Sequence, residues 1–197
     1  MTDWTSLTYV VIDVEGNGQQ PPNLVELAAV RIESGVIGEP VSWLVRPLAP
    51  ITPFARRIHG ISNEQVAGAP VIADVKDEVL ALLVDAAVVG HNVHVDLAVL
   101  ERELGGWQRP EVFDTLKLAR RLLPGNDGYK LGALVEAFKL AEGLPDEMVP
   151  HRATYDALVT ARLFVRLATL PDTRPLSLEE LRGDSPGGGQ DEPPGLF

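Results

Sequence analysis

Residues 7–15 read LTYVVIDVE, a β-branched apolar run that ends in two carboxylates. Its apolar part is short enough to form a buried β-strand. Because side chains alternate along a strand, Asp13 and Glu15 project from the same face, roughly 6 to 7 Å apart along the chain. An isolated Asp-x-Glu pair is usually a solvated strand end. Here, two uncompensated carboxylates at the edge of a core are costly, which favours a bound cation.

Further apolar runs extend outward from this strand. Strands are predicted at residues 24–32, 41–46, 86–89 and 112–113, and helices at 75–83, 97–104, 115–123, 131–140 and 153–170. Three strands in succession, followed by strands that alternate with helices, are typical of an α/β fold. We therefore expect a mixed central sheet flanked by helices.

The chain has 197 residues, 45% of them hydrophobic, which predicts one domain with a continuous core. We place this folded domain at residues 1–170. Residues 171–197 are rich in Pro and Gly and carry net negative charge. They are expected to form a flexible tail, with one helical turn near 178–181.

The composition excludes several classes of protein. There is no cysteine, so disulfide scaffolds, thiolate zinc sites and cysteine nucleophiles are excluded. A formal charge of -11 argues against a broad basic surface for nucleic acid, although a local contact with a polyanion stays open. The first residues lack the pattern of a signal peptide, and no apolar run is long enough to span a membrane. We expect a cytoplasmic protein without a membrane partner.

Two other carboxylates occupy positions where ligand-binding groups are common. Asp96 follows a short buried strand in HNVHVD (residues 91–96), although taken alone it would more often cap the next helix. Asp156 lies in HRATYDA (residues 151–157), on the first turns of the last predicted helix. His151 and Asp156 converge only if the histidine precedes that helix, which Pro150 makes reasonable.

Two other kinds of site are disfavoured because the sequence lacks the motifs that they need. Gly16, Asn17 and Gly18 follow a strand, as in a dinucleotide-binding loop, but Pro21 stands where the third glycine is needed and no Gly-Lys-Ser/Thr occurs. No Gly-x-Ser-x-Gly elbow of a serine hydrolase occurs either.

Taken in order, five motifs resemble the DEDDh type of 3'-5' exonuclease, the family of the proofreading epsilon subunit of bacterial DNA polymerase III. The resemblance covers about residues 7–170. Each motif is weak alone, but five in the right order and spacing are hard to obtain by accident. The motifs are VIDVE (11–15), IHGI (58–61), HNVHVD (91–96), FDTLKLARR (113–121) and HRATYDA (151–157).

The resemblance implies a ribonuclease H-like fold in which four carboxylates hold two divalent cations, Mg2+ or Mn2+. Hard cations prefer oxygen ligands, and a pair of them can stabilise the attacking and leaving oxygens at phosphorus. By similarity, the histidine of the family signature is the general base for the nucleophilic water, since imidazole can accept a proton near neutral pH. The implied metal ligands are Asp13, Glu15, Asp96 and Asp156, and the implied base is His151.

Substrate contacts are also implied by the resemblance. His59 and Asn92 match family positions near the terminal nucleotide, although for His59 a purely structural turn role is equally open. Many relatives have two threonines where this chain has Gly16 and Asn17, so only a backbone amide would remain there to reach the terminal sugar or base. Asp114 is expected to cap a helix rather than bind a ligand.

The function that the resemblance implies is metal-dependent release of 5'-mononucleotides from the 3' end of DNA, most readily single-stranded, in proofreading or repair. Two alternatives are an exoribonuclease of the ribonuclease T or oligoribonuclease type and a catalytically idle nucleic-acid-binding subunit. A polymerase subunit or a sliding clamp is a candidate partner, since the terminal Leu196 and Phe197 could dock as a short peptide.

Overall fold

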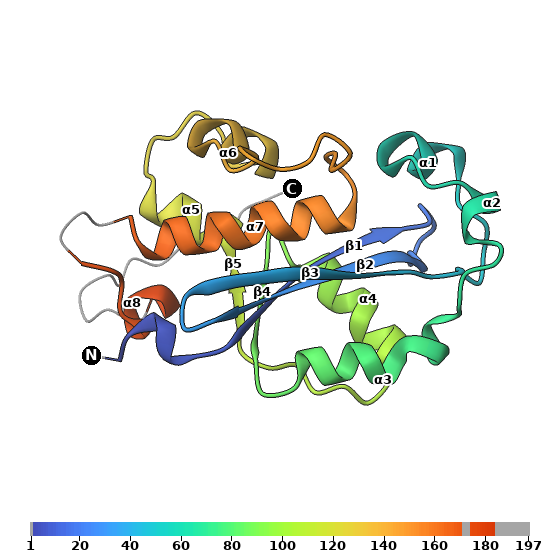
Figure 1. Cartoon of the computed structure of the whole chain (residues 1–197), viewed down its shortest axis with the longest axis horizontal. Helices are drawn as coiled ribbons and strands as arrows, with labels where there is room; N and C mark the ends of the chain where they lie inside the picture. The colour runs from blue at the N-terminus through green and yellow to red at the C-terminus, as the bar shows by residue number, and fades with distance from the viewer. Residues whose placement is uncertain (1, 171–173, 184–197) are drawn as a thin grey trace, which may run out of the picture.

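The computed structural model describes residues 2–170 and 174–183, and its centre is one five-stranded sheet (Figure 1). The strand order is β3-β2-β1-β4-β5. β1 pairs antiparallel with β2 and parallel with β4, and β4 pairs parallel with β5, so the predicted mixed sheet is confirmed. The strands are β1 (Tyr9–Gly16), β2 (Leu24–Glu33), β3 (Val36–Leu44), β4 (Ala87–Gly90) and β5 (Val112–Asp114).

Helices cover both faces of the sheet (Figure 1). None of those within residues 2–170 and 174–183 has the length and apolarity needed to cross a bilayer. A short 3-10 helix, Trp4–Ser6, precedes β1. The α-helices are α1 (Pro53–His59), α2 (Asn63–Val66), α3 (Ile72–Leu83), α4 (His94–Leu104), α5 (Thr115–Leu122), α6 (Leu131–Phe138), α7 (Ala153–Ala168) and α8 (Leu178–Arg182).

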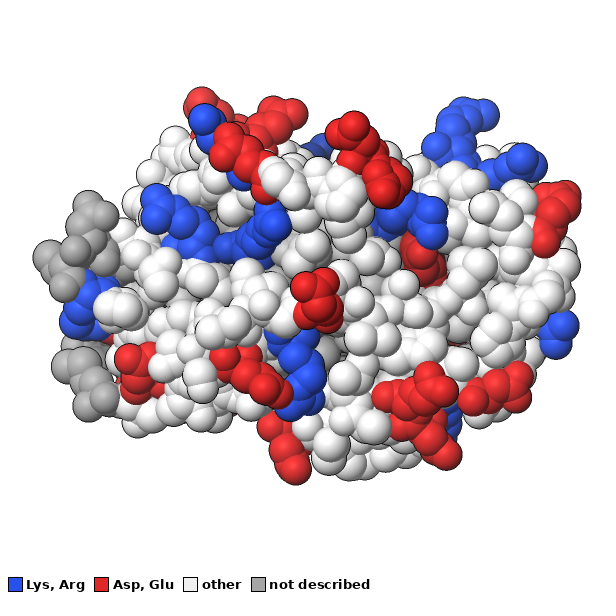
Figure 2. Space-filling model, viewed as in Figure 1, with Lys and Arg blue, Asp and Glu red and all other residues white. Residues whose placement is uncertain are grey.

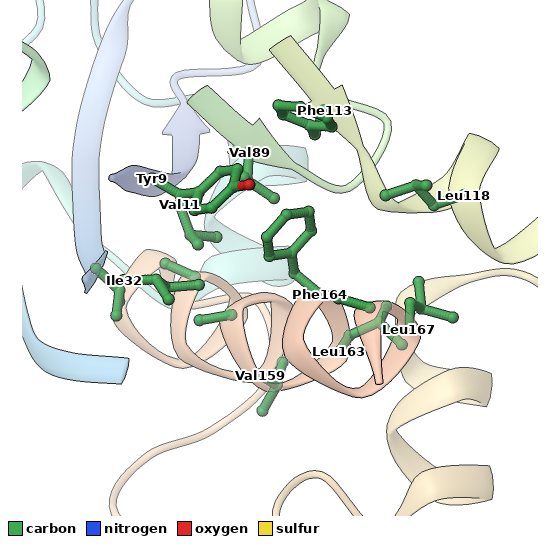
Figure 3. Packing of buried hydrophobic residues seen from close by; sticks show 14 of the residues in the cluster. Tyr9, Val11, Ile32, Val89, Phe113, Leu118, Val159, Leu163, Phe164 and Leu167 are labelled. Atoms are coloured by element: carbon green, nitrogen blue, oxygen red, sulfur yellow. The ribbon is translucent and has the colours of Figure 1, made fainter. Parts of the chain in front are cut away.

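The alternation of side chains along β1 divides the core into two layers. Tyr9 and Val11 pack with α7 on one face, whereas Val10 and Ile12 pack with residues of α3 and α4 on the other. Figure 3 shows the first layer, where Phe164 of α7 lies against Tyr9, with ring centroids 4.8 Å apart. The inner strands β1, β2 and β4 are therefore largely buried on both faces, whereas the edge strand β3 is mostly exposed.

The long helix α7 lies close to the sheet because several of its side chains that face the sheet are small. Ala153, Ala157 and Ala161 are completely buried, at intervals of four residues. This packing fixes the N-terminal end of α7 beside the C-terminal end of β1. The functional side chains on these two elements are consequently held by the core.

Two predictions about the first half of the chain are wrong in detail. The third strand is Val36–Leu44 instead of residues 41–46, because this edge strand exposes Val36 and Val41 and has no clear apolar alternation. The short helices α1 and α2 were not predicted. α1 depends on local signals, namely the Thr52 cap, a proline at its first position, and Gly60 in the left-handed conformation at its end.

Residues 174–183, which follow the boundary predicted at Leu170, pack onto the folded domain. Leu176, Leu178 and Leu181 are buried in the layer that contains α7. The backbones of Ser177 and Asp3 form an isolated antiparallel β-bridge, and Arg121 donates hydrogen bonds to the carbonyls of Glu180 and Leu181. The helical turn expected near 178–181 is present as α8. The remainder of the predicted tail, 171–173 and 184–197, lies outside the described residues.

Figure 2 shows acidic and basic side chains interspersed over the face that carries α7. They form no broad basic surface on this face, in agreement with the expectation from the net charge of -11. Any contact with a polyanion on this side would have to be local.

Candidate active site

Three carboxylates meet where the end of β1 lies beside the start of α7. Asp13 and Glu15 extend from β1, and Asp156 extends from the first turn of α7. Each offers one oxygen, and these three oxygens lie within 4.8 Å of one another. The prediction that Asp13 and Glu15 share a face is therefore confirmed. This separation allows a single cation to contact all three groups.

Asp96 of α4 lies beside this group of three without belonging to it, and it does not cap the helix. It lies in the first turn of α4, and its Oδ1 accepts a hydrogen bond from the backbone N–H of Val14 at 3.0 Å. Val14 stands between Asp13 and Glu15, so this bond ties α4 to the acidic end of β1. The helix-capping interpretation of Asp96 is wrong, because its carboxylate points to β1.

His151 lies in the turn immediately before α7. Its backbone N–H donates a hydrogen bond to Oδ2 of Asp156 at 3.0 Å, and the turn places it in the left-handed region with φ of 63°. The residue is exposed, and its backbone N–H connects it to the acidic cluster. The histidine thus precedes the helix, which is the geometry that its convergence with Asp156 required.

The electrostatics of the cluster are unfavourable without a cation. Burial raises the pKa of Asp13 well above its usual range, and the charges of Asp96, Asp156 and Glu15 raise it further. Burial, with a contribution from Asp156, raises the pKa of Glu15 to about 8. Burial also raises the pKa of Asp96 to about 7 and that of Asp156 to about 6. These oxygen donors fit a divalent ion that would compensate their charge.

The raised pKa values predict how stability depends on pH. A carboxyl whose folded-state pKa is raised contributes stability at low pH that is lost as the pH rises through the folded value. For Asp156, Asp96 and Glu15 this window extends from about pH 4 to the folded values of about 6, 7 and 8. We expect Mg2+ or Mn2+ to raise the melting temperature more at pH 8 than at pH 5. Thermal melts in EDTA and in metal measure this, and an equal rise at both pH values would contradict it.

The structure does not support a substrate role for the side chain of Asn17. This residue is fully buried, and its Nδ2 donates to Asn23 Oδ1 and to the Ala49 carbonyl. Its Oδ1 accepts from the backbone N–H groups of Gln19 and Asn23. The backbone N–H of Asn17 is also used, since it donates to the Asn23 carbonyl. These groups of Asn17 hold the loop after β1 together. Gly16 lies at the end of β1, beside this loop.

His59 has one structural contact and one unsatisfied ring nitrogen. Its Nδ1 accepts a hydrogen bond from the backbone N–H of Ile61 at 3.0 Å, which braces the turn after α1. Its Nε2 is buried and forms no hydrogen bond of standard geometry within residues 2–170 and 174–183, although the backbone of Gly16 interacts with the ring and opposes the fall in its pKa. Burial lowers the pKa of this imidazole, which keeps the ring neutral. A turn role is shown, and Nε2 is still able to bond to a ligand.

Asn92 and Asp114 are linked beside the end of β4. Asn92 is exposed, and its backbone N–H donates to Oδ1 of Asp114 at 2.9 Å. The same oxygen accepts from the N–H of Leu116, so the predicted cap of α5 is confirmed. Asn92 therefore lies just after the end of β4, two residues before α4, which carries Asp96.

An ion pair beside the site was not predicted, and in it the carboxylate is buried while the guanidinium is 40% exposed. Glu26 of β2 accepts hydrogen bonds from Nη2 and Nε of Arg152 at 2.6 and 3.0 Å, and from the backbone N–H of Ala153 at 2.9 Å. These bonds fix the chain between His151 and α7. The available signal was a single charged residue inside the apolar run LVELAAV at residues 24–30.

Replacing Glu26 with Gln tests this clamp. The variant loses the charge that pairs with Arg152 and at least one acceptor, so we expect the free energy of unfolding to fall by about 1–3 kcal/mol. Urea denaturation measures it. Glu39→Gln, at an exposed position of β3, is the matched control and should leave stability within about 0.5 kcal/mol. Equal stability of the two variants would contradict a structural role for Glu26.

Comparisons with known proteins agree with this geometry. A family model described as "Exonuclease" (RNase_T) matches residues 10–164. The chain is 36% identical over 166 residues to DNA polymerase III subunit epsilon of Aquifex aeolicus, with 81% of this chain and 80% of that protein covered. It is 40% identical to the 3'-5' exonuclease DinG of Bacillus subtilis, but covers only 17% of that protein's length.

Solved structures give the same result. A structure of exonuclease X in complex with 5' overhanging duplex DNA is 37% identical, with a TM-score of 0.67. The match covers 81% of this chain and 90% of that one. The nuclease domain of 3'hExo, described as a DEDDh family member, has a TM-score of 0.67 at 17% identity, which supports the fold alone. The predicted ribonuclease H-like fold and family are confirmed.

Proposed function

Because the chain belongs to the exonuclease family, we propose that it is a metal-dependent 3'-5' exonuclease that releases 5'-mononucleotides from the 3' end of DNA. The observation that carries this proposal is the cluster of Asp13, Glu15 and Asp156, with His151 bonded to Asp156. Family membership supports the reaction, and the cluster supports retention of the residues that perform it.

The acidic cluster of an exonuclease-family protein implies divalent metal ions. We propose two ions, Mg2+ or Mn2+, held by Asp13, Glu15 and Asp156, with Asp96 completing the set. When bound, such ions would lower the pKa of a water molecule and stabilise charge that develops on the phosphate. The raised pKa values of the four carboxyls support this proposal, because bound cations would compensate their buried charge.

The remaining residues have proposed roles in proton transfer and binding. The exposed imidazole of His151 accepts the proton of the attacking water. The hydrogen bond from the backbone N–H of His151 to Asp156 holds the residue beside the cluster. Nε2 of His59 and the side chain of Asn92 contact the terminal nucleotide. The Glu26–Arg152 pair keeps the turn that carries His151 in place.

The substrate is proposed to be DNA. Exodeoxyribonuclease 10 of Escherichia coli is 39% identical to this chain, and the exonuclease X structure contains DNA. These relatives do not favour the exoribonuclease alternative. The intact acidic cluster likewise does not favour an idle binding subunit.

Matched oligomers test this choice. We expect single-stranded DNA to be shortened at least about 10-fold faster than RNA of the same sequence, in a metal-dependent reaction. A faster reaction on RNA would contradict the proposed substrate. The absence of cleavage on both, in the presence of metal, would contradict the proposed reaction.

We also propose, from the epsilon-like relatives, that a DNA polymerase subunit or a sliding clamp is a partner and that the location is cytoplasmic. The peptide suggested for docking, ending in Leu196 and Phe197, lies outside the described residues. Deleting residues 185–197 should weaken binding to the partner and leave cleavage of free oligomers unchanged. Unchanged binding would contradict a docking role for this peptide.

A further inference from the structure

A cavity of about 1090 Å³ lies along β5, between α4, α5 and α8. β5 is the last strand of the sheet and pairs only with β4 among the described strands. The loop before α4 closes one end of this cavity and α8 lines it at Leu181 and Arg182. We refer to it as the β5 groove.

The β5 groove is basic although the protein is acidic. Against a net charge of -11 for the chain, the carboxylates in its lining are those of Glu111 and Asp114. Glu111 is paired with Arg182, and Asp114 is engaged as the cap of α5. The cations that line the groove are Arg109, Lys117, Arg120, Arg121 and Arg182.

Three of these cations share one face of α5. Lys117, Arg120 and Arg121 follow i, i+3, i+4 spacing, while Leu118 and Ala119 between them face the core. Like charges at this spacing destabilise an isolated helix. Arg121 is used to hold α8, whereas Lys117 and Arg120 make no ion pair or hydrogen bond within residues 2–170 and 174–183. Their exposed charges are available to an anion.

The groove reaches the sheet edge that carries the acidic cluster. β1, β4 and β5 are parallel, so their carboxyl ends lie on the same side of the sheet. Asn92 lines the groove and is bonded through its N–H to Asp114 at the end of β5. The helix that begins just after it, α4, carries Asp96, which is bonded to Val14 between Asp13 and Glu15. The groove and the acidic cluster therefore lie at the same end of the parallel strands, with Asn92 and α4 between them.

We propose that the β5 groove binds the phosphodiester backbone of the nucleic-acid substrate outside the active site. Lys117 and Arg120 contact its phosphates, while the 3' end occupies the acidic cluster. This inference rests on the proposed function, because it takes the same strand as ligand. A polynucleotide is favoured over an acidic protein because it carries one negative charge at every residue and already has its end in the adjoining site.

The test uses the full chain with Lys117 and Arg120 both replaced by Gln. The matched control, Arg31→Gln with Arg46→Gln, removes the same charge from β2 and the segment after β3, at the opposite side of the sheet. Affinity for a 5'-fluorescein DNA of about 20 nucleotides is measured by anisotropy in Ca2+ at several salt concentrations, and cleavage of this DNA and of a trinucleotide is measured in Mn2+.

We expect the groove variant to bind the long DNA about 10-fold more weakly at low salt. The slope of log affinity against log salt should become shallower by about 1.4, for two lost phosphate contacts at about 0.7 each. KM for the long DNA should rise with kcat unchanged, and cleavage of the trinucleotide should stay within about 2-fold. The control should match the unmodified protein.

Three results would overturn the inference. The first is unchanged affinity of the groove variant for the long DNA, and the second is a loss of trinucleotide cleavage equal to the loss on the long DNA. The third is a loss of binding to poly-glutamate without a loss of binding to DNA, which would assign the groove to an acidic protein. Failure of the proposed exonuclease function can be distinguished from failure of the groove inference. In the first case the unmodified protein would cleave neither substrate, whatever the DNA affinities of the two variants.

Discussion

Replacing Asp13 with Asn is expected to reduce the rate of 3'-end cleavage by about 1,000-fold or more. Burial and the charges of four neighbouring acids raise the pKa of Asp13 well above its usual range, so it is the natural centre of a cation site. Metal ions contribute several kcal/mol of charge stabilisation in such reactions, and about 1.4 kcal/mol corresponds to a factor of ten. Initial rates on a labelled oligomer, with metal in excess, measure the effect.

The same variant should become more stable in EDTA. The neutral amide removes a buried charge that Asp96, Asp156 and Glu15 repel, so the melting temperature at pH 8 should exceed that of the unmodified protein. The metal-induced rise should be largely lost. Asp77→Asn, at an exposed position of α3, is the control and should change neither value. Full activity of the Asp13 variant would show that the assigned site is wrong.

Replacing His151 with Ala is expected to lower kcat by about 100- to 10,000-fold, the range for general acid–base catalysis. The imidazole is exposed and makes no contact that holds the core, and the N–H that bonds to Asp156 belongs to the backbone. Stability and the metal-induced rise in melting temperature should therefore be retained. Single-turnover rates and thermal melts on the same preparation measure both.

The results for the Asp13 and His151 variants together separate metal binding from proton transfer. Loss of activity with retained metal stabilisation assigns His151 to proton transfer, whereas loss of both effects assigns Asp13 to metal binding. A His151 variant that loses its metal response along with its activity would contradict the role of a base. It would instead indicate that the turn before α7 had been disrupted.

The parts of the site that the sequence predicted correctly depend on local geometry. Asp13 and Glu15 share a face because strands alternate, and His151 reaches Asp156 because it precedes a helix. The buried position of Asn17 could not be predicted from the sequence, because it depends on contacts with Asn23 and the Ala49 carbonyl. Asp96 resembled a helix cap because the pattern around it does not reveal that Val14 is its partner.

Long-range contacts explain what could not be predicted. The pair of Glu26 and Arg152 joins residues 126 positions apart, so no local motif connects them. Composition placed the end of the folded domain at Leu170, but three buried leucines after that point attach residues 174–183 to the core. The apolar strands and long helices were predictable because their periodicity is strong. The edge strand β3 and the short α1 and α2 were not, because each depends on few side chains.

The most direct test of the central claim is digestion of one single-stranded DNA labelled at its 5' end or at its 3' end, with Mn2+ and with EDTA. A 3'-5' exonuclease with a metal site at Asp13, Glu15 and Asp156 should shorten the 5'-labelled strand stepwise and release the 3' label as a mononucleotide at once. EDTA should stop both reactions. Cleavage that persists in EDTA, or that proceeds from the 5' end, would contradict the account.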